Sequence, residues 1–300
     1  MIRNLAEARA ADLVEVLAGS PYRAIGSLGA GGMGEVFVVE HRLLSQRFAL
    51  KVMHRHLIEQ RGFVERFRLE ARALAQVRHP HVVEIVDFWS TPSGVPCMLM
   101  ELLEGRTLAA ELRRRGRLPP SDALRIACQA LAGLEAIHAH GIVHRDVKPE
   151  NLFLEESARG TSPRVRILDL GLARFVGWPG GASFEGTAAV HTTTGSVIGS
   201  FRYMSPEGRR GERLDRRGDI YSLAVVLYEM LVGEGGAHEP GRPFEPPSVR
   251  LARPTLRRID DILQRALQSD PARRYRTAED LLADLWAASI DLEPHPGGAP

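Results

Sequence analysis

The sequence predicts an α+β fold, with strands near the N-terminus and helices over most of the rest of its 300 residues. Three patterns support this prediction. β-Branched and aromatic residues adjoin a glycine-rich stretch at 29–34 and recur at 47–53, as they do in successive strands. Apolar residues within 63–77 recur at spacings of about four and three, which places them on one face of a helix. The segment 219–231 is almost wholly apolar and indicates a buried helix.

Composition and charge exclude several classes of protein. Hydrophobic residues make up 44% and charged residues 25% of the chain, and the net charge of +2 argues against a dedicated nucleic-acid binder. No run approaches the ~20 apolar residues of a membrane span, and the N-terminus is unlike a signal peptide. The two cysteines, Cys97 and Cys128, have apolar neighbours and are expected to be buried, reduced thiols. We therefore expect a cytoplasmic protein, anchored to a membrane only if the chain is a fragment of a longer one.

The stretch Gly29-x-Gly31-x-x-Gly34 raises the question of what a glycine cluster does when no helix follows it. A dinucleotide-binding turn leads into a helix and has an acidic residue about twenty positions later. Here a strand-like run begins at Val36, and the position about twenty after Gly34 is His54. The residues therefore favour a hairpin of two strands, whose backbone N–H groups can cover the phosphates of a nucleotide.

A charged pair is predicted between the next strand and the following helix. Alternation along 47–53 puts Lys51 on one face together with Ala49. Glu70 is the only charge on the apolar helical stripe, and a carboxylate on a buried face needs a partner. A lysine on such a strand ordinarily extends its ammonium group to solvent. The presence of both charges favours a Lys51–Glu70 ion pair instead.

A polar loop between apolar flanks is a common place for catalytic groups. The segment "GIVHRDVKPENLFL" contains Asp146, Lys148 and Asn151, and Pro149 rules out a continuous helix through it. Asp169 follows a second strand-like run and precedes a glycine. These residues are the candidate catalytic groups.

These motifs, in this order and at these separations, resemble those of the protein kinase superfamily. More narrowly, they resemble the eukaryotic-like (Hanks-type) serine/threonine protein kinases of bacteria, and the resemblance covers about 22–286. The motifs are the glycine loop, Ala49-Leu50-Lys51, Glu70, His144-Arg145-Asp146 with Asn151, Asp169-Leu170-Gly171, Ser205-Pro206-Glu207, Asp219 and Arg274. The resemblance implies a bilobal fold, with a small antiparallel β-sheet N-lobe that includes one helix (helix C) and a larger, mainly α-helical C-lobe.

The resemblance also implies the domain organisation. We expect an N-terminal extension at 1–20, a catalytic domain at 21–288 and a flexible tail at 289–300. The N-lobe would span about 21–101 and the C-lobe about 105–288, with ATP bound in the cleft between them.

The implied activity is that of a non-specific serine/threonine protein kinase in signal transduction, which uses ATP with Mg²⁺ (or Mn²⁺). By the resemblance, Asp146 accepts the proton of the substrate hydroxyl and Lys148 steadies the γ-phosphoryl group. Lys51 bridges the α- and β-phosphates, while Asn151 and Asp169 hold the metal. The implied nucleotide-binding residues are Leu28, Gly29, Ala30, Gly31, Gly32, Met33, Gly34, Val36, Ala49, Lys51, Glu70, Met100, Glu101, Leu102 and Leu103.

The resemblance extends to substrate class and regulation. Lys148 is the residue that serine/threonine kinases carry at its position, and Ser200 keeps the hydroxyl that they usually supply as threonine. Protein substrates with Ser or Thr are therefore expected, as is autophosphorylation at Thr192 or Thr194, for which a homodimer is one arrangement. Phosphate at either threonine would give Arg145 an anionic partner.

Two departures from the family pattern concern regulation and docking rather than catalysis. Leu170 replaces the commoner phenylalanine of the metal-binding triplet. The segment after Gly233 is short and rich in Gly and Pro, where family members have a helix that helps to dock substrates.

Three other features have plainer explanations than a separate site. His138, His140 and His144 lack a further ligand for zinc and mark a helix end that leads into the candidate loop. The arginines at 113–117 are expected to be a solvated helix terminus rather than a nucleic-acid site. Cys128 lies on a helical stripe with leucines and is expected to be a core residue, not a nucleophile.

Two alternative functions remain open beside an active protein kinase. A pseudokinase would typically lack Lys51, Asp146 or Asp169, and all three are present. A small-molecule kinase of similar fold would usually lack the Ser-Pro-Glu motif paired with a late arginine, and both occur here.

Overall fold

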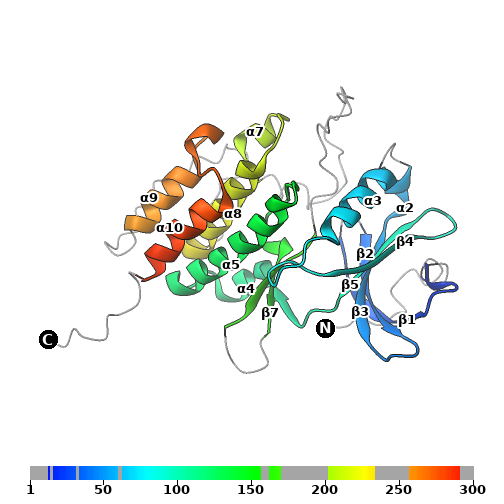
Figure 1. Cartoon of the computed structure of the whole chain (residues 1–300). Helices are drawn as coiled ribbons and strands as arrows, with labels where there is room; N and C mark the ends of the chain where they lie inside the picture. Colours follow the sequence, from blue (N-terminus) through cyan, green and yellow to red (C-terminus); the bar gives the residue numbers. More distant parts are fainter. Residues whose placement is uncertain are drawn as a thin grey trace. The chain divides into compact units, whose positions relative to one another are not determined.

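The computed structural model describes residues 13, 16–31, 34–59, 63–156, 162–169, 202–233 and 257–290. By its contacts the chain divides into two compact units, Met1–Arg78 with Val83–Glu104 and His79–Val82 with Gly105–Pro300. The first unit holds a five-stranded sheet, and the second holds most of the helices together with a three-stranded sheet (Figure 1). Strands therefore gather near the N-terminus and helices follow, as the sequence predicts.

The first unit combines an antiparallel sheet with helices. The strands follow the order β1-β2-β3-β5-β4, so that β1 and β4 form its edges in the described part of the chain. The glycine-rich stretch joins β1 to β2, which confirms the predicted hairpin. The elements are β1 (Tyr22–Ala30), β2 (Gly34–His41), β3 (Arg47–Met53), α2 (Arg55–Ile58), α3 (Phe63–Leu74), β4 (Ile85–Ser90) and β5 (Pro96–Glu101).

One face of this sheet packs against residues of the N-terminal extension. Leu13 and Val16 are 5% and 4% exposed and belong to one apolar cluster with Phe48, Leu50 and Val52 of β3. The alternation expected for β3 is confirmed, because these three side chains share that face of the sheet. The described part of the extension is thus part of the core of the first unit.

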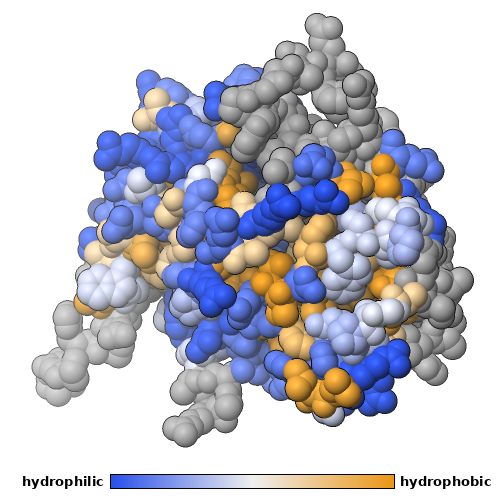
Figure 2. All heavy atoms as spheres, turned by 45° about the vertical axis from the view of Figure 1, so that its right-hand side comes forward, coloured by the Kyte–Doolittle hydropathy of each residue, from blue (hydrophilic) through white to orange (hydrophobic). Residues whose placement is uncertain are grey.

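Several apolar side chains remain on the surface. Leu43 and Leu44, in the β2–β3 turn, are 86% and 68% exposed. Their backbone N–H groups both donate to His41 Nδ1, at 3.3 and 3.2 Å, which fixes the turn. Figure 2 shows apolar residues, in orange, between hydrophilic ones over the face in view. Scattered exposure of this kind is normal on a folded protein and indicates no site by itself.

The second unit consists of helices packed around α8, with a small sheet of order β6-β7-β8. Of the helices that the structure describes, none combines the length and the apolar character needed to cross a bilayer. The elements are β6 (Gly105–Thr107), α4 (Leu108–Arg115), α5 (Pro120–Ala139), the 3-10 helix η2 (Pro149–Asn151), β7 (Leu152–Glu155), β8 (Arg164–Ile167), α7 (Pro206–Arg209), α8 (Arg216–Val232), α9 (Arg257–Ala266), the 3-10 helix η5 (Pro271–Arg273) and α10 (Ala278–Ile290).

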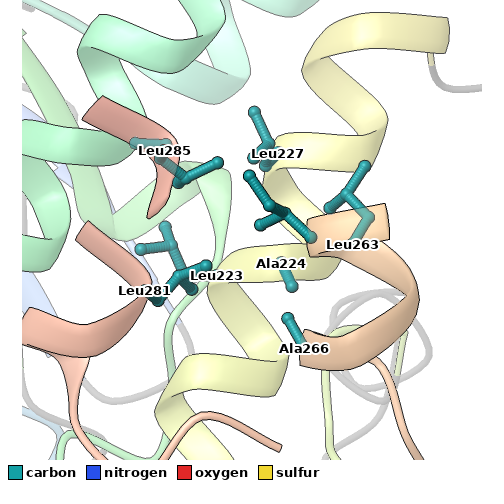
Figure 3. A pocket seen from close by; sticks show the side chains of 9 residues that line it. Leu223, Ala224, Leu227, Leu263, Ala266, Leu281 and Leu285 are labelled. Carbon is teal, nitrogen blue, oxygen red and sulfur yellow. The ribbon is translucent and has the colours of Figure 1, made fainter. Parts of the chain in front are cut away.

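Helix α8 is buried on every side, from Gly218 to Leu231. Figure 3 shows how Leu223, Ala224 and Leu227 of α8 meet apolar side chains of α9 and α10. Helix α5 packs on α8 and α10 as well. This central position explains why the sequence of α8 is apolar all round rather than amphipathic.

The two cysteines differ in burial. Cys97 is buried, as predicted, but Cys128 is only partly buried because it lies at the edge of the apolar stripe of α5. Burial still raises the pKa of Cys128 to about 11. The thiol is therefore protonated at neutral pH and is a poor nucleophile.

Candidate active site

The hairpin of β1 and β2 needs glycine at Gly34 for a reason internal to the fold. A Cβ atom there would lie 2.2 Å from the carbonyl oxygen of Val52 in β3. Among the described residues, a Cβ atom at Gly29 would meet nothing within 4 Å, and one at Gly31 only the oxygen of Gly34, at 4.0 Å. Neither Gly29 nor Gly31 has a positive φ. The open space beside these two residues suits the close approach of a ligand.

We expect Gly34→Ala to destabilise the first unit by about 1–3 kcal/mol, because β2 and β3 must move apart to admit the methyl group. Gly29→Ala is the matched control, and its stability without nucleotide should match that of the parent protein. Thermal unfolding without nucleotide measures both. Equal losses in the two variants would contradict the steric argument.

Strand pairing places several predicted nucleotide-binding residues on one face of the sheet. Val36 of β2 pairs with Lys51 of β3, and Ala49 of β3 pairs with Met100 of β5. Paired residues of antiparallel strands project to the same side. This is the face opposite the one that packs against Leu13, and Lys51 on it is 5% exposed.

The expected partner of Lys51 is only partly described. Glu70 lies in α3, as predicted, but its side chain falls outside the described residues. The apolar members of its stripe behave as predicted, since Phe67 and Leu74 are 1% and 5% exposed. The Lys51–Glu70 ion pair therefore stays a prediction.

The segment after β5 offers backbone groups rather than side chains. The N–H of Glu101 donates to the carbonyl of Glu84 at 3.1 Å, so it is not available to a ligand. Among the described residues, the N–H groups of Leu102 and Leu103 donate to no backbone acceptor. A base that binds here would find its donor at 102 or 103 rather than at 101.

Three predicted catalytic residues meet around one carboxylate. Lys148 Nζ lies 2.7 Å from Asp146 Oδ2, and Asn151 Nδ2 donates to the same oxygen at 3.0 Å. Asn151 Nδ2 also donates to the backbone carbonyl of Asp146 at 2.8 Å. The loop between α5 and η2 thus presents an ammonium, a carboxylate and an amide in direct contact.

Asp219, near the start of α8, holds the backbone of this loop through hydrogen bonds. Its Oδ2 accepts the N–H of His144 at 2.8 Å, and its Oδ1 accepts the N–H of Arg145 at 2.7 Å. His138 Nε2, on α5, donates to Asp219 Oδ2 at 2.8 Å. Burial alone would raise the pKa of Asp219. The hydrogen bond from His138, followed by the charges of His138 and His144 and the N–H of Arg145, outweighs burial and lowers that pKa.

This support matters because the loop has an unusual backbone. Arg145, within this loop, has a φ of +65°, and Asp169, just after β8, has a φ of +24°; both values are unfavourable for residues with a side chain. His144 contacts both segments, since its Nδ1 accepts the N–H of Asp146 at 3.3 Å and its Nε2 donates to the carbonyl of Leu168 at 3.1 Å. The sequence reasoning missed the anchoring roles of His138 and Asp219. A single carboxylate opening an apolar helix was the signal that could have revealed them.

A second buried carboxylate of α8 holds the segment before α7. The hydroxyl of Tyr203 donates to Glu229 Oε2 at 2.6 Å, and Arg202 Nη1 lies 3.7 Å from Glu229 Oε1. Burial, followed by the charge of Glu229, raises the pKa of Tyr203 well above its usual value. Glu229 was not singled out from the sequence.

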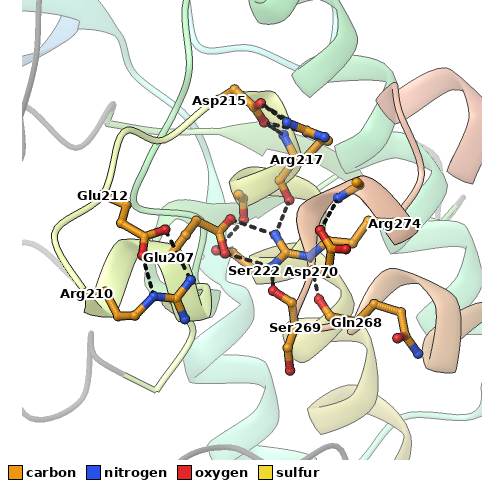
Figure 4. A network of polar contacts seen from close by, with 12 residues as sticks. Glu207, Arg210, Glu212, Asp215, Arg217, Ser222, Gln268, Ser269, Asp270 and Arg274 are labelled. Atoms are coloured by element: carbon orange, nitrogen blue, oxygen red, sulfur yellow. Dashed lines mark hydrogen bonds and ion pairs between the residues drawn. The ribbon is translucent and has the colours of Figure 1, made fainter.

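The predicted pair of Glu207 and Arg274 is present and buried. The guanidinium binds both carboxylate oxygens at 2.7 Å, and its remaining N–H groups donate to the backbone carbonyls of Arg217, Gln268 and Ser269 (Figure 4). Its guanidinium carbon also lies 4.8 Å from the centre of the Tyr221 ring. Burial alone would raise the pKa of Glu207, but the bonds from Arg274 outweigh burial and lower that pKa.

The polar groups of the second unit suit a hard divalent cation. Both N–H groups of Asn151 are directed at Asp146, so its carbonyl oxygen is left to act as an acceptor or ligand. In the part of the chain that the structure describes, no three His, Cys, Asp or Glu side chains gather as a metal cage. Mg²⁺ needs no such cage, because it binds through one or two protein oxygens, water and substrate phosphates.

The histidines and arginines for which no separate site was predicted contact different partners. His140 Nδ1 contacts the carbonyl of Ala136 at 2.9 Å, away from the contacts of His138 and His144. Arg114 and Arg115, in the last turn of α4, form ion pairs with Glu111. Several predictions lie outside the described residues, namely those on Gly32, Met33, Leu170, Thr192, Thr194, Ser200, the segment after Gly233 and the tail after 290.

Comparison with known proteins identifies the family. The model of the protein kinase domain family matches residues 22–287, which is most of the chain. The chain belongs to the protein kinase domain family. The bilobal kinase fold accounts for the two units, and the kinase domain begins at β1 in this match.

Individual kinases resemble the chain over nearly its whole length. The serine/threonine-protein kinase pkn2 of Myxococcus xanthus is 39% identical over 290 residues, which cover 90% of this chain and 33% of pkn2. The serine/threonine-protein kinase PknB of Mycolicibacterium smegmatis is 35% identical over 91% of this chain and 43% of PknB. The crystal structure of the Mycobacterium tuberculosis PknI kinase domain superposes with a TM-score of 0.68 at 27% identity, covering 90% of this chain and 96% of that one. The chain spans between a third and a half of the length of these two curated relatives.

Proposed function

We propose that this chain is the catalytic domain of a serine/threonine protein kinase that transfers the γ-phosphoryl group of ATP to hydroxyl groups of proteins. The observation that carries the proposal is the contact of Asp146 with Lys148 and Asn151 on a loop that Asp219 holds in a strained conformation. Phosphoryl transfer depends more on correctly positioned charges than on covalent catalysis. This loop holds a carboxylate and an ammonium group in fixed positions.

In the proposed step, Asp146 accepts the proton of the substrate hydroxyl. The hydroxyl oxygen forms a bond to the γ-phosphorus while the bond from that phosphorus to the bridging oxygen of ADP breaks, and ADP leaves with the electron pair. Lys148 moves from its contact with Asp146 toward the transferred group and balances its charge. Asn151 keeps Asp146 oriented through its amide.

The first unit would bind the nucleotide. Lys51 would contact the α- and β-phosphates, and the backbone near Gly29 and Gly31 would cover them, since a Cβ atom at Gly29 would meet no described residue within 4 Å and one at Gly31 only the oxygen of Gly34, at 4.0 Å. The adenine base would lie against Ala49 and Met100, with its donor at Leu102 or Leu103. Mg²⁺ (or Mn²⁺), when bound, would neutralise phosphate charge, and Asn151 and Asp169 are the residues that would hold it.

Two observations support serine and threonine as the proposed acceptor residues: the presence of Lys148 and the names of the relatives. Both pkn2 and PknB carry serine/threonine-protein kinase in their names.

The test of the proposed function is ADP release by the protein with Mg²⁺-ATP, with and without a generic protein substrate. Release that rises with the protein substrate supports the proposal. No release would indicate a pseudokinase, and release that responds only to small alcohols would indicate a small-molecule kinase.

Autophosphorylation is a further expectation of the proposed function. We expect Thr192 or Thr194 to gain phosphate on incubation with Mg²⁺-ATP and activity to rise, because phosphate would supply Arg145 with a charged, bidentate partner. Mass spectrometry locates the phosphate. The variant Thr192→Ala/Thr193→Ala/Thr194→Ala should lose most of the activation, and full activity in it would contradict the expectation.

We propose two further properties that accompany this activity. The kinase domain would work in the cytoplasm, where ATP and Mg²⁺ are abundant, and would autophosphorylate between two copies in a transient homodimer. Mixing active protein with an inactive, size-tagged copy tests the second property. Phosphate on the inactive copy is the expected result.

A further inference from the structure

His54 follows directly after β3 and contacts the glycine hairpin of the first unit. Its Nε2 lies 2.9 Å from the carbonyl oxygen of Gly31, across 23 positions of the chain. A carbonyl oxygen can only accept a hydrogen bond, so the imidazole donates it from Nε2. The roles proposed above for the nucleotide and the substrate hydroxyl do not include His54.

The other backbone polar group of Gly31 also has a partner. Its N–H donates to the carbonyl of Gly34 at 2.8 Å, and this bond closes the connection between β1 and β2. One hydrogen bond thus joins Gly31 to the start of β2, and the other joins it to the residue that follows β3. Gly31 is therefore held from two sides by groups of the first unit.

A glycine-rich connection has few other means of keeping one conformation. Glycine has no side chain to pack, and it loses more backbone entropy on ordering than any other residue. The pairing of β1 with β2 ends at Ala30 and Glu35, so Gly31 lies just beyond the ladder. The bond from His54 therefore restrains the hairpin where strand pairing no longer does.

The position of His54 also connects the hairpin to the strand of Lys51. Gly34 pairs with Met53, the last residue of β3, and His54 is the first residue after that pair. Lys51 lies on the same strand and is the residue proposed to contact the α- and β-phosphates. The bond from His54 thus fixes the hairpin relative to Lys51, and both would have to contact one triphosphate at the same time.

We propose that His54 is a positioning residue for ATP, which holds the glycine hairpin in its phosphate-covering conformation through the carbonyl of Gly31. The inference rests on the proposed function, because it concerns the nucleotide that this function requires. A hairpin that is ordered before binding loses less conformational entropy when the nucleotide binds. His54 acts only through the hairpin, so its loss should raise the KM for ATP and leave kcat nearly unchanged.

The test is the equilibrium binding of a fluorescent ATP analogue, with Mg²⁺, to the whole chain. His54→Leu keeps an extended side chain but removes the donor, and it should raise Kd about three- to tenfold, as expected for the loss of one hydrogen bond. His54→Gln keeps an N–H donor and should leave Kd within about twofold of the parent value. Steady-state rates should show the same rise in the KM for ATP in His54→Leu, with kcat within about twofold.

Hydrogen exchange without nucleotide tests the restraint directly. The peptide that contains Gly31 should exchange its amide hydrogens faster in His54→Leu than in the parent protein or in His54→Gln. His140→Leu is the matched control, because His140 Nδ1 also contacts a backbone carbonyl at 2.9 Å, that of Ala136 in α5. This control should leave Kd within about twofold of the parent value.

Circular dichroism establishes that each variant is folded, and His54→Ala replaces His54→Leu if that variant is not. Three results would overturn the inference: an unchanged Kd in His54→Leu, an equal loss in His54→Gln or His140→Leu, or a fall in kcat at an unchanged KM. Binding and exchange are measured without phosphoryl transfer. A protein that transfers no phosphate would therefore contradict the proposed function, while weaker analogue binding by His54→Leu alone would still support the role of His54.

Discussion

Asp146→Asn is expected to lower the rate of phosphoryl transfer by about 10²–10⁴-fold or more, while ATP affinity stays within a few-fold of the parent value. Asparagine keeps the shape of Asp146 and its contact with Asn151, but it cannot accept a proton from the substrate hydroxyl. Initial rates with a protein substrate and the binding of a fluorescent ATP analogue measure the two effects separately.

Two further variants make this result specific. Asp169→Asn is expected to weaken Mg²⁺-ATP binding and transfer together, because the proposed metal ligand acts on the phosphates. Asp122→Asn is a control on α5, where the carboxylate pairs with Arg115 and Arg125 near the surface. Its rate should stay within about twofold of the parent rate. Equal, small losses in the Asp146 and Asp169 variants would show that the proposed roles are wrong.

Arg274→Leu is expected to reduce the free energy of unfolding by about 3–5 kcal/mol, because it leaves the carboxylate of Glu207 buried without its bidentate partner. The side chains of Arg274 and Glu207 are 0% and 6% exposed, so water cannot replace the lost bonds. Chemical denaturation followed by tryptophan fluorescence measures the change.

The nearby pair of Arg210 and Glu212 is a control of the same chemistry in a different environment. Figure 4 shows this pair beside the buried one. Its two side chains are 55% and 53% exposed, and Arg210→Leu should leave the stability close to that of the parent protein. The double variant Arg274→Leu/Glu207→Leu should recover part of the loss, since no charge is then left buried. A loss in Arg274→Leu no larger than that in Arg210→Leu would refute the explanation by burial.

Local patterns predicted those parts of the fold that depend on neighbours in sequence. The strand-like run after Gly34 separated a hairpin from a dinucleotide-binding turn, because side-chain period differs between strands and helices. The same alternation placed Lys51 and Leu50 on opposite faces of β3. Spacing within one loop brought Asp146, Lys148 and Asn151 into a single hypothesis.

Contacts between distant segments were not predictable in this way. Asp219 reaches His138 across 81 positions, and no periodicity in either segment specifies that contact. The need for glycine at Gly34 arises from the backbone of the adjacent strand at Val52, which a single sequence does not reveal. Cys128 has the spacing of a core residue yet lies at the rim of its helix stripe, because spacing gives a direction but not a depth.

The packing of Leu13 and Val16 against β3 has a consequence for how the catalytic domain is produced and trimmed. A chain that starts at Tyr22, where the family match begins, lacks both side chains. The apolar face of the sheet that they cover would then be exposed to solvent. Burial of one such side chain is worth about 1.5–3 kcal/mol, so we expect the shortened protein to melt earlier and to aggregate on warming. Light scattering during a thermal ramp, compared with a chain that starts at Met1, measures the effect. We therefore place the practical boundary of this kinase domain before residue 13. A segment joined to the chain just before Leu13 would be connected directly to the apolar core of the first unit.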